Sequence, residues 1–322
     1  MIKRLMRVPI AALTVGLLAA GCASTKATSG SASAGPVEKH DLTVAAVPAL
    51  DSVGLYIAQQ RGLFAAQGLH VKIVPAISSE TTISAQRAGH FDVTVGNYVS
   101  YILANATQGA KLHILDAGSI MEPGAQELVV PAGSPLHSIS QLKGKTIGVN
   151  VLHGIVALLV SALLRDNGVP PSQVHFKAIP FPLMTNALKA HQVDAASLPE
   201  SFSTTAEETI GAQPFADLDQ GAAASLPISG YVVTNAWLRK YPKTAAAFSR
   251  AAVEGQRIAD TNPVAVQQAM MTFTGATKQV AALMATLNYP LDTDPVLIQR
   301  VADLMKQFGV LKQRYNVMPM IH

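Results

Sequence analysis

Residues 42–74, LTVAAVPALDSVGLYIAQQRGLFAAQGLHVKIV, carry a complete strand–helix–strand unit. LTVAAV (42–47) is a short apolar run typical of a buried strand, and HVKIVPA (70–76) is a second strand-like run. Residues 54–67 between them have apolar side chains at helical spacing, and Gly68 suits the positive φ that often follows a helix. Two strands joined by a helix of this length predict a parallel pair in an α/β sheet.

The same alternation continues and then restarts further along the chain. We expect further strands at 91–96, 111–119, 126–132, 145–150, 174–181, 193–199 and 229–235, with helices between most of them. After Trp237 the pattern becomes helical, at 241–261, 263–272, 274–287 and 295–308. The predicted fold class is therefore α/β, with two strand–helix lobes and a C-terminal helical segment.

The first residues of the chain differ from the rest. Three cations and an apolar stretch precede Cys22, which is the pattern of a signal peptide over residues 1–21. LLAAGC (17–22) resembles a lipobox, although Ala19 stands where leucine is commonest. We expect Cys22 to carry lipid and to anchor the chain at the extracytoplasmic face of a membrane. The alternative is an ordinary secretory signal that leaves Cys22 as a free thiol.

Composition supports a neutral domain on a tether. Residues 23–40, ASTKATSGSASAGPVEKH, have almost no large apolar side chains, so we expect residues 22–40 to be a flexible tether. Removal of residues 1–21 lowers the formal net charge from +4 to +1, which gives no electrostatic case for binding nucleic acid. Cys22 is the only cysteine, so no intrachain disulfide is expected. No later apolar run reaches the length of a membrane span.

Four stretches carry a resemblance to a known family. They are GLYIAQQRGLFAAQGLHVKIV (54–74), AGHFDVTVGN (88–97), SISQLKGKTIGVN (138–150) and PFPLMTNALKAHQVDAASLPESF (180–202). Together they resemble ABC-transporter solute-binding proteins, and among these the nitrate/sulfonate/taurine and thiamine-pyrimidine (NMT1/THI5-like) group. The resemblance covers about residues 42 to 260.

The resemblance implies a fold and a set of partners. The fold would be the type II periplasmic-binding-protein architecture, with lobe 1 at 41–131 and 233–322 and lobe 2 at 132–232. Strands near 127–132 and 231–235 would form a two-strand hinge, and ligand would lie between the lobes. The implied partners are a small-molecule solute, an ABC permease and its ATPase, and the chain would act as a monomer.

Ligands of open α/β sheets bind beyond the carboxyl ends of the strands, which directs attention to the residues there. The candidate ligand-binding residues are Asp51, Ser52, Ser78, Ser79, Asn97, Tyr98, His153, Gly154 and Glu200.

Most of these candidates also have a purely structural interpretation. Residues 51–52 and Ser79 are residue types that cap helices. Tyr98 either stacks on a ligand ring or packs within its lobe, and a lone histidine such as His153 is commonly a surface or capping group. Glu200 either contacts the ligand or forms a salt bridge between the lobes.

The charges near the expected cleft favour one class of ligand. The segments there contain Asp51, Glu80, Glu122 and Glu200 and no lysine or arginine. Carboxylates oppose an anion and accept hydrogen bonds, so the balance tilts toward a neutral or cationic solute with donors, such as an amino-pyrimidine. Nitrate or a sulfonate would have to bind through helix N-termini alone.

An enzyme is the main alternative class, because the THI5 branch includes pyrimidine synthases that use cysteine and histidine. Here the one cysteine is assigned to the anchor, and no G-x-S-x-G, H-E-x-x-H or Walker-type motif is present. The histidines are scattered singly, without metal-ligand spacing. We therefore expect a binding protein with no catalytic residue, metal or cofactor. A third class is a sensor module that acts on a separate membrane receptor.

Overall fold

The structure, a computed structural model of the 322-residue chain, describes residues 36–321. The predicted signal peptide (1–21), the lipidation site Cys22 and the tether as far as residue 35 lie outside the described residues. None of the helices in residues 36–321 combines the length and the hydropathy of a bilayer-crossing segment.

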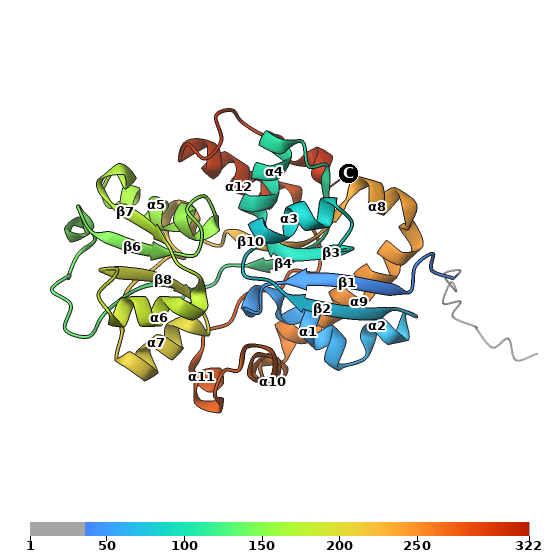
Figure 1. The fold of residues 1–322 in the computed structure, drawn as a ribbon, viewed down its shortest axis with the longest axis horizontal. Coiled ribbons are helices and arrows are strands. Elements are labelled where there is room, and N and C mark those ends of the chain that lie inside the picture. Colours follow the sequence, from blue (N-terminus) through green and yellow to red (C-terminus); the bar gives the residue numbers. More distant parts are fainter. Residues whose placement is uncertain (1–35, 322) are drawn as a thin grey trace, which may run out of the picture. The chain divides into compact units, whose positions relative to one another are not determined.

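The first sheet has five strands in the order β2-β1-β3-β10-β4 (Figure 1). Its strands are β1 (Asp41–Ala46), β2 (His70–Pro75), β3 (Val93–Asn97), β4 (Leu112–Ile120) and β10 (Pro227–Thr234). Strand β1 pairs in parallel with both β2 and β3, whereas β10 runs antiparallel between β3 and β4. We call this sheet and its helices lobe 1.

The second sheet also has five strands, in the order β7-β6-β8-β5-β9. Its strands are β5 (Gln126–Val130), β6 (Thr146–Val149), β7 (His175–Ala178), β8 (Ala195–Pro199) and β9 (Gln213–Asp217). Strand β6 pairs in parallel with β7 and β8, and β5 runs antiparallel between β8 and β9. Both sheets are thus mixed, and the predicted parallel pairing holds for three strands of each. We call this part lobe 2.

The helices lie between the strands and in the C-terminal segment. Those of lobe 1 are η1 (Leu50–Ser52), α1 (Val53–Gln60), α2 (Leu63–Ala66), α3 (Ser79–Arg87) and α4 (Tyr98–Gln108). Those of lobe 2 are η2 (Ile139–Leu142), α5 (Ile155–Asp166), η3 (Pro171–Gln173), α6 (Phe181–Lys189), α7 (Phe202–Ile210) and η4 (Gly221–Ala223). The C-terminal segment has α8 (Asn235–Lys240), α9 (Pro242–Thr261), α10 (Pro263–Thr274), α11 (Lys278–Leu283), α12 (Pro295–Gln307) and η5 (Met318–Met320).

Two expected helices differ from the observed ones. The helix expected over residues 54–67 is divided into α1 and α2, because Gly62 adopts a left-handed conformation with φ of 68° between them. The helix expected over 274–287 is shorter, because Thr277 caps α11 by accepting a hydrogen bond from the Val280 amide at 3.1 Å. Helix α7 and strand β9 lie in a stretch for which the sequence pattern suggested no element.

The two strand connections between the lobes lie earlier than the expected boundaries. The chain passes from lobe 1 to lobe 2 at residues 121–125, between β4 and β5, and returns at 218–226, between β9 and β10. The boundaries expected after residues 131 and 232 would leave β5 in lobe 1 and most of β10 in lobe 2. Each crossing strand instead enters the next sheet as an inner strand, and the alternation of elements along the chain does not reveal which sheet a strand joins.

Residues 36–40 do not behave as part of a flexible tether. The Glu38 carboxylate accepts hydrogen bonds from the Lys243 and Thr244 amides, at 3.1 and 2.8 Å, and so supplies acceptors at the N-terminus of α9. Lys39 forms a salt bridge with Asp92. The expected tether therefore ends by residue 36, because a helix end far along the chain provides the partners that ordered backbone requires.

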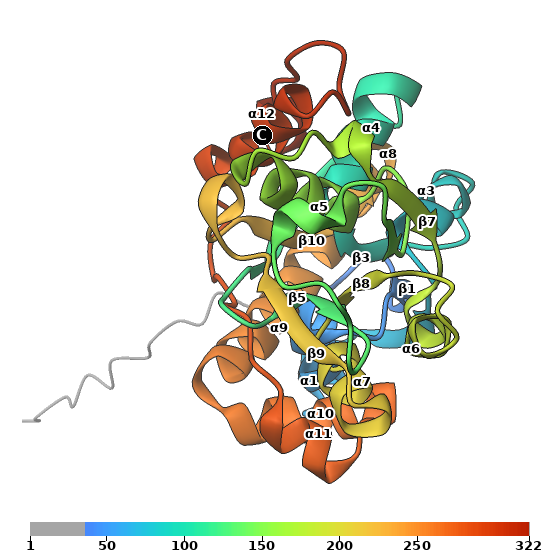
Figure 2. The same cartoon turned by 90° about the vertical axis from the view of Figure 1, so that its left-hand side faces the viewer.

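The core of lobe 1 lies between its sheet and helices α1, α2 and α9, where Phe64 and Phe248 stack with ring centroids 5.0 Å apart. The core of lobe 2 continues into α4 and α12, so the lobes also meet through apolar packing. Figure 2 shows α12 and α4 at one end of the molecule and α10 and α11 at the other. The carboxyl ends of the parallel strands of both lobes lie in the region between.

Candidate functional site

A small cavity of about 60 Å³ lies between the two lobes. Segments that follow β1, β2 and β3 line it from lobe 1, and segments that follow β6, β7 and β8 line it from lobe 2. The lining residues are Val47, Ala49, Leu50, Asp51, Ser78, Ser79, Asn97, Ala125, Gln126, Asn150, Ile155, Val156, Phe181, Pro199, Glu200, Ile228 and Leu287. Ligands of α/β proteins bind at this edge of a sheet.

Asp51 is the acidic residue of lobe 1 in this cavity. It lies in η1, directly after β1, and its Oδ1 atom is buried without a hydrogen-bond partner among the described residues. Burial raises the pKa of Asp51 to about 7, and its own backbone amide opposes this shift only in part. A buried carboxylate oxygen without a donor is costly, so the site is suited to a ligand that supplies one.

Ser79 and Asn97 form a rigid polar wall. Asn97 donates to the Ser79 hydroxyl from its backbone amide at 2.9 Å and from Nδ2 at 3.1 Å. The Asn97 Oδ1 atom caps α4 by accepting from the Ser100 amide at 2.9 Å. Gly96 permits this packing, because a Cβ there would lie 2.1 Å from the Ser79 hydroxyl oxygen. Ser79 therefore does not cap α3, and its hydroxyl instead joins α3 to the end of β3.

Ser78 and Asn150 face the cavity from opposite lobes. Ser78 occupies the N-cap position of α3, but its side chain makes no capping hydrogen bond. Asn150 follows β6, and its Oδ1 atom is buried without a partner among the described residues. Asn150 and Asp51 thus present two unpaired acceptors to one cavity, one from each lobe.

Glu200 follows β8 and is only 5 % exposed. Both its carboxylate oxygens accept from the Thr204 hydroxyl at 2.8 Å, and Oε1 also accepts from the Ala285 amide at 3.4 Å. It forms no salt bridge with any residue in 36–321, so the alternative of an interlobe ion pair is wrong. Glu200 is an oriented carboxylate at the cavity wall.

More carboxylates surround Glu200. Burial raises the pKa of Glu127 to about 7, and the nearby carboxylates of Glu207, Glu200 and Asp217 add to the shift. Glu127 lies opposite Asp217 in the β5–β9 pairing. No lysine, arginine or histidine is among the residues that line the cavity. The lobe 2 side of the site therefore has an electrostatic potential that opposes an anion.

Apolar residues from both lobes complete the wall of the cavity. Phe181 lines the cavity and stacks on Phe202, with centroids 5.5 Å apart. Phe181 therefore both packs within lobe 2 and lines the site. Met184, on the same helix, is fully buried in the core of lobe 2.

Four candidate residues do not line the cavity. Ser52 is completely buried at the N-cap position of α1, without a side-chain capping bond. Tyr98 is buried in the core, where its ring lies against Gly230, so it is placed for packing rather than for stacking on a ligand. His153 is exposed in the loop before α5. Gly154 is the N-cap residue of α5, and a Cβ there would lie 3.4 Å from Glu80 Oε1.

The other acidic residues of the expected cleft lie outside the cavity. Glu80 accepts a hydrogen bond from the Ser100 hydroxyl, and its Oε2 atom is buried without a partner among the described residues. Glu122 is exposed. Two of the four expected carboxylates, Asp51 and Glu200, therefore line the site.

Several lining residues were not among the candidates. Gln126 begins β5 and donates from Nε2 to the Ser197 hydroxyl at 2.9 Å. Asn150 could have been chosen, because it ends the strand-like run KTIGVN. Leu287 comes from the C-terminal segment, and no local pattern marks it as a lining residue.

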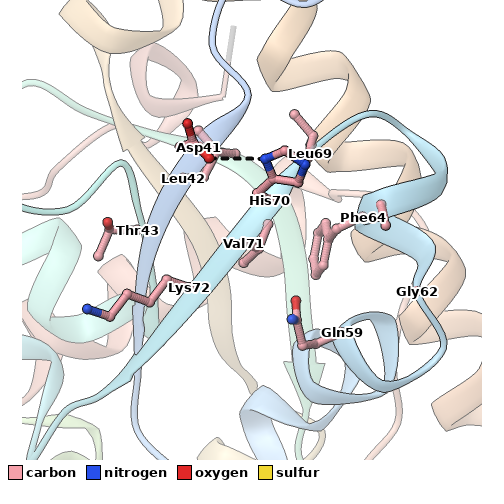
Figure 3. A pocket seen from close by; sticks show the side chains of 11 residues that line it. Asp41, Leu42, Thr43, Gln59, Gly62, Phe64, Leu69, His70, Val71 and Lys72 are labelled. Atoms are coloured by element: carbon pink, nitrogen blue, oxygen red, sulfur yellow. Dashed lines mark hydrogen bonds and ion pairs between the residues drawn. The ribbon is translucent and has the colours of Figure 1, made fainter.

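A second, larger pocket of about 530 Å³ lies at the other end of the lobe 1 strands (Figure 3). Strands β1 and β2 and helices α1 and α2 supply its walls, and His70 Nδ1 lies 3.1 Å from Asp41 Oδ1, within hydrogen-bonding distance, at its rim. None of the candidate residues lines it. No group of His, Cys, Asp and Glu suited to a metal ion occurs within residues 36–321.

Comparison with known proteins identifies similar folds. The alkanesulfonate-binding protein SsuA from Xanthomonas axonopodis pv. citri, solved with MOPS bound, has a TM-score of 0.75 and 17% identity, covering 89% of this chain and 99% of that one. The desulfurization enzyme DSZB has a TM-score of 0.70 and 15% identity, covering 88% of this chain and 96% of that one. At these identities the likeness establishes the fold, which binding proteins and an enzyme share.

Sequence comparison identifies the family. A putative thiamine biosynthesis protein from Haemophilus influenzae is 27% identical over 145 residues, which are 45% of each chain, so the match spans less than half of that relative. The family model described as NMT1/THI5 like matches residues 49–266, more than half of this chain. That range includes β2 to β10 and nearly all of the cavity lining. The chain belongs to the NMT1/THI5-like family.

Proposed function

We propose that this protein is an extracytoplasmic solute-binding lipoprotein of an ABC importer. It captures a small polar solute between its lobes and delivers it to a membrane permease driven by an ATPase. The observation that carries the proposal is the cavity itself, to which the strand ends of both lobes contribute oriented polar side chains. The similarity to the alkanesulfonate-binding protein SsuA supports a binding role.

The unpaired acceptors define the chemistry of the solute. Asp51 and Asn150 each present a buried oxygen without a donor, and Glu200 adds a carboxylate. A solute with N–H donors, either neutral or cationic, satisfies these oxygens, and an amino-substituted nitrogen heterocycle fits this description. The apolar wall around Phe181 would cover the face of such a ring.

The volume of the cavity indicates a closed arrangement. About 60 Å³ is the space of one or two waters and is well below the size of a typical ligand site. Entry of a heterocycle therefore requires the lobes to move apart. The segments 121–125 and 218–226 are the places where a hinge rotation would occur.

We propose that the protein binds and releases the solute without changing it chemically. The cavity lining contains neither cysteine nor histidine, the residue types that the THI5-like synthases use. The thiamine-biosynthesis name of the relative from Haemophilus influenzae is consistent with a pyrimidine-type solute as well as with an enzyme. Recovery of the bound compound by mass spectrometry separates these two functions.

A thermal-shift screen tests the proposal directly. The panel contains amino-pyrimidines, riboflavin, choline-like cations, taurine, alkanesulfonates and nitrate. A ligand at 100 times its Kd stabilises the protein by about 2.7 kcal/mol, which raises Tm by a few degrees. Stabilisation by a heterocycle or cation that is recovered intact supports the proposal. Stabilisation by nitrate or a sulfonate contradicts the ligand class, and chemical turnover contradicts the binding function.

The lipid anchor and the partner have separate tests. Cys22→Ser should release the mature protein from the membrane fraction into the medium, whereas a free thiol predicts no change in location. Solute uptake by membrane vesicles that contain the permease should require the protein. If ligand binding instead activates a receptor without uptake, the sensor alternative is correct.

A further inference from the structure

Positive charge is concentrated at one end of lobe 1. Residues 36–321 contain 20 lysines and arginines and 20 aspartates and glutamates, so this part of the chain has no formal net charge. Nine of the cations nevertheless lie near the amino-terminal edge of the first sheet, and we call this set the basic face. Its members are Lys39, Arg61, Lys72, Arg87, Lys111, Arg239, Lys240, Lys243 and Arg250.

The topology brings these residues together. Strands β1 and β2 begin side by side, with Asp41 opposite His70. Helices α1 and α3 return toward this edge from the cavity, so Arg61 and Arg87 lie at its margin. The Lys111 carbonyl accepts from the Asn235 amide at 2.9 Å, which places the start of β4 beside α8. The start of β1, α2 and α8 lie at the same end of the molecule in Figure 1.

The charge of the basic face is not neutralised within lobe 1. All members except Lys39 are exposed, and none of these exposed cations forms a salt bridge with a residue in 36–321. Two of the carboxylates at this edge are used internally. Glu38 accepts from the first amides of α9, and Asp92 accepts from Lys39, Trp237 Nε1 and the Thr43 amide.

The rest of the described chain carries an excess of negative charge. Outside the basic face and the three carboxylates at this edge, Glu38, Asp41 and Asp92, residues 36–321 hold 11 cations and 17 carboxylates. Asp51 and Glu200 are at the cavity, and Glu127 and Asp217 are close to it. The protein is therefore polarised along the strands of lobe 1, from a basic face to an acidic cavity region.

We propose that the basic face binds the anionic phospholipid surface of the membrane. The described chain begins at Pro36, within this face, so a lipid on Cys22 would hold the same end of lobe 1 near the bilayer. Each lysine or arginine close to an anionic surface strengthens binding, and a basic patch is a common second signal beside a lipid chain. The proposal rests on the extracytoplasmic location proposed above, but not on the identity of the solute.

The pocket in Figure 3 opens on the same face. Thr43, Gln59, His70 and Lys72 line it with hydrogen-bonding groups, and the Asp41 carboxylate lies beside His70 at its rim. Its volume of about 530 Å³ is sufficient for a phospholipid headgroup. Lipid binding there would hold the cavity between the lobes away from the bilayer by roughly the length of a strand, about 20 Å for six residues. The site for solute would then be open to the surroundings until the protein turns to meet its permease.

Vesicle co-sedimentation tests the proposal. The full chain carries Cys22→Ser so that no lipid anchor contributes, and it is mixed with phosphatidylcholine vesicles with and without phosphatidylglycerol at several salt concentrations. One variant combines Arg239→Glu, Lys240→Glu and Lys243→Glu on the basic face. A matched control combines Lys143→Glu, Lys177→Glu and Lys189→Glu, which are exposed residues of lobe 2. Thermal unfolding confirms that both variants fold, and glutamine substitutions replace glutamate if one does not.

We expect the parent chain to bind the anionic vesicles at least tenfold more tightly than the neutral ones, with an affinity that falls as salt rises. The affinity of the basic-face variant for anionic vesicles should fall about tenfold, and that of the lobe 2 control should stay within about threefold of the parent. Equal losses in both variants, or no preference for anionic vesicles, would overturn the proposal. Binding to DNA or heparin without binding to vesicles would overturn it as well. A thermal-shift screen without hits would leave this result unaffected.

Discussion

The two lobes have the same strand order but contribute different chemistry to the cavity. In each sheet three parallel strands are followed by an antiparallel strand that the chain forms directly after crossing from the other lobe, and then by a fifth strand. This antiparallel strand is β10 in lobe 1 and β5 in lobe 2. In lobe 1 the strand ends carry Asp51, Ser79 and Asn97, which are fixed by short hydrogen bonds or buried without a donor. In lobe 2 they carry Asn150, Phe181 and Glu200, among apolar neighbours.

This difference indicates that the cavity-facing edges of the two sheets have different roles in binding a solute. Lobe 1 has the more rigid polar surface, because Gly96 allows α3 to approach β3 closely enough for Ser79 and Asn97 to bond. On the lobe 2 side the contacts are apolar and less directional. Phe181 stacks on Phe202, and the flexible side chain of Met184 packs against Gly148 of β6. A solute would then be oriented by lobe 1 and covered by lobe 2 when the lobes close.

The largest expected change in stability comes from replacing a glycine in lobe 1, and a matched glycine in lobe 2 provides the comparison. Gly96→Ala places a methyl group 2.1 Å from the Ser79 hydroxyl oxygen and should lower the free energy of unfolding by about 3 kcal/mol. Gly148→Ala on β6 meets the flexible Met184 Sδ at 2.5 Å and should cost about 1 kcal/mol. Urea denaturation of both variants measures the difference, and equal costs would show that the lobes are equally rigid.

Asp51→Asn should separate binding from stability. Affinity for a cationic or donor-rich solute should fall about 10- to 100-fold, because a charge-assisted hydrogen bond is lost. The unliganded protein should become more stable at pH 8, because a buried carboxylate with an unpaired oxygen is replaced by a neutral amide. Calorimetry and thermal unfolding measure the two effects, with the exposed Asp292→Asn as the control. Unchanged affinity would remove Asp51 from the site.

The raised pKa of Asp51 predicts that the affinity for a cationic solute depends on pH. The folded-state pKa of about 7 exceeds the ordinary 3.8, so the folded protein holds this proton more tightly than the unfolded chain. This contribution to stability is complete below about pH 4 and is lost as pH rises toward 7. Because only the ionised form attracts a cation, affinity should rise about tenfold between pH 6 and pH 8. Titration calorimetry at several pH values measures this, and a flat profile in the wild type would contradict it.

Of these substitutions, Asn150→Ala should reduce the affinity for the solute least. It removes a neutral acceptor from the lobe 2 side of the cavity, and the loss of one neutral hydrogen bond reduces affinity about fivefold. Asn186→Ala, an exposed position on α6, is the control and should leave affinity unchanged. A loss as large as that of Asp51→Asn would mean that lobe 2 orients the solute as strongly as lobe 1.

Much of the fold followed from local patterns. The strand-like runs and their flanking glycines located most strands and helices, because buried parallel strands are continuous apolar runs and helix ends favour glycine. The lobe boundaries did not follow, since β5 and β10 cross into the other sheet and their pairing is decided by contacts far apart in sequence.

The candidate site was predictable to the extent that it depends on strand ends. Asp51, Ser78, Ser79, Asn97 and Glu200 line the cavity, and each follows a strand that the sequence pattern reveals. Tyr98 follows a strand as well, but the first turn of α4 directs its ring into the core. Leu287 could not be found in this way, because the C-terminal segment reaches the cavity only through tertiary packing.

The contacts that Glu38 and Lys39 make with α9 and Asp92 have a mechanical consequence. If the chain is tethered at its N-terminal end, any pulling force enters the folded part through Glu38 and Lys39, where α9 and Asp92 receive it. The load then passes into β1, which is held on both sides by β2 and β3 and resists being sheared out of the sheet. The path from the tether into the sheet of lobe 1 does not include residues 121–125 or 218–226, so a force applied to lobe 1 does not act across the segments that join the lobes.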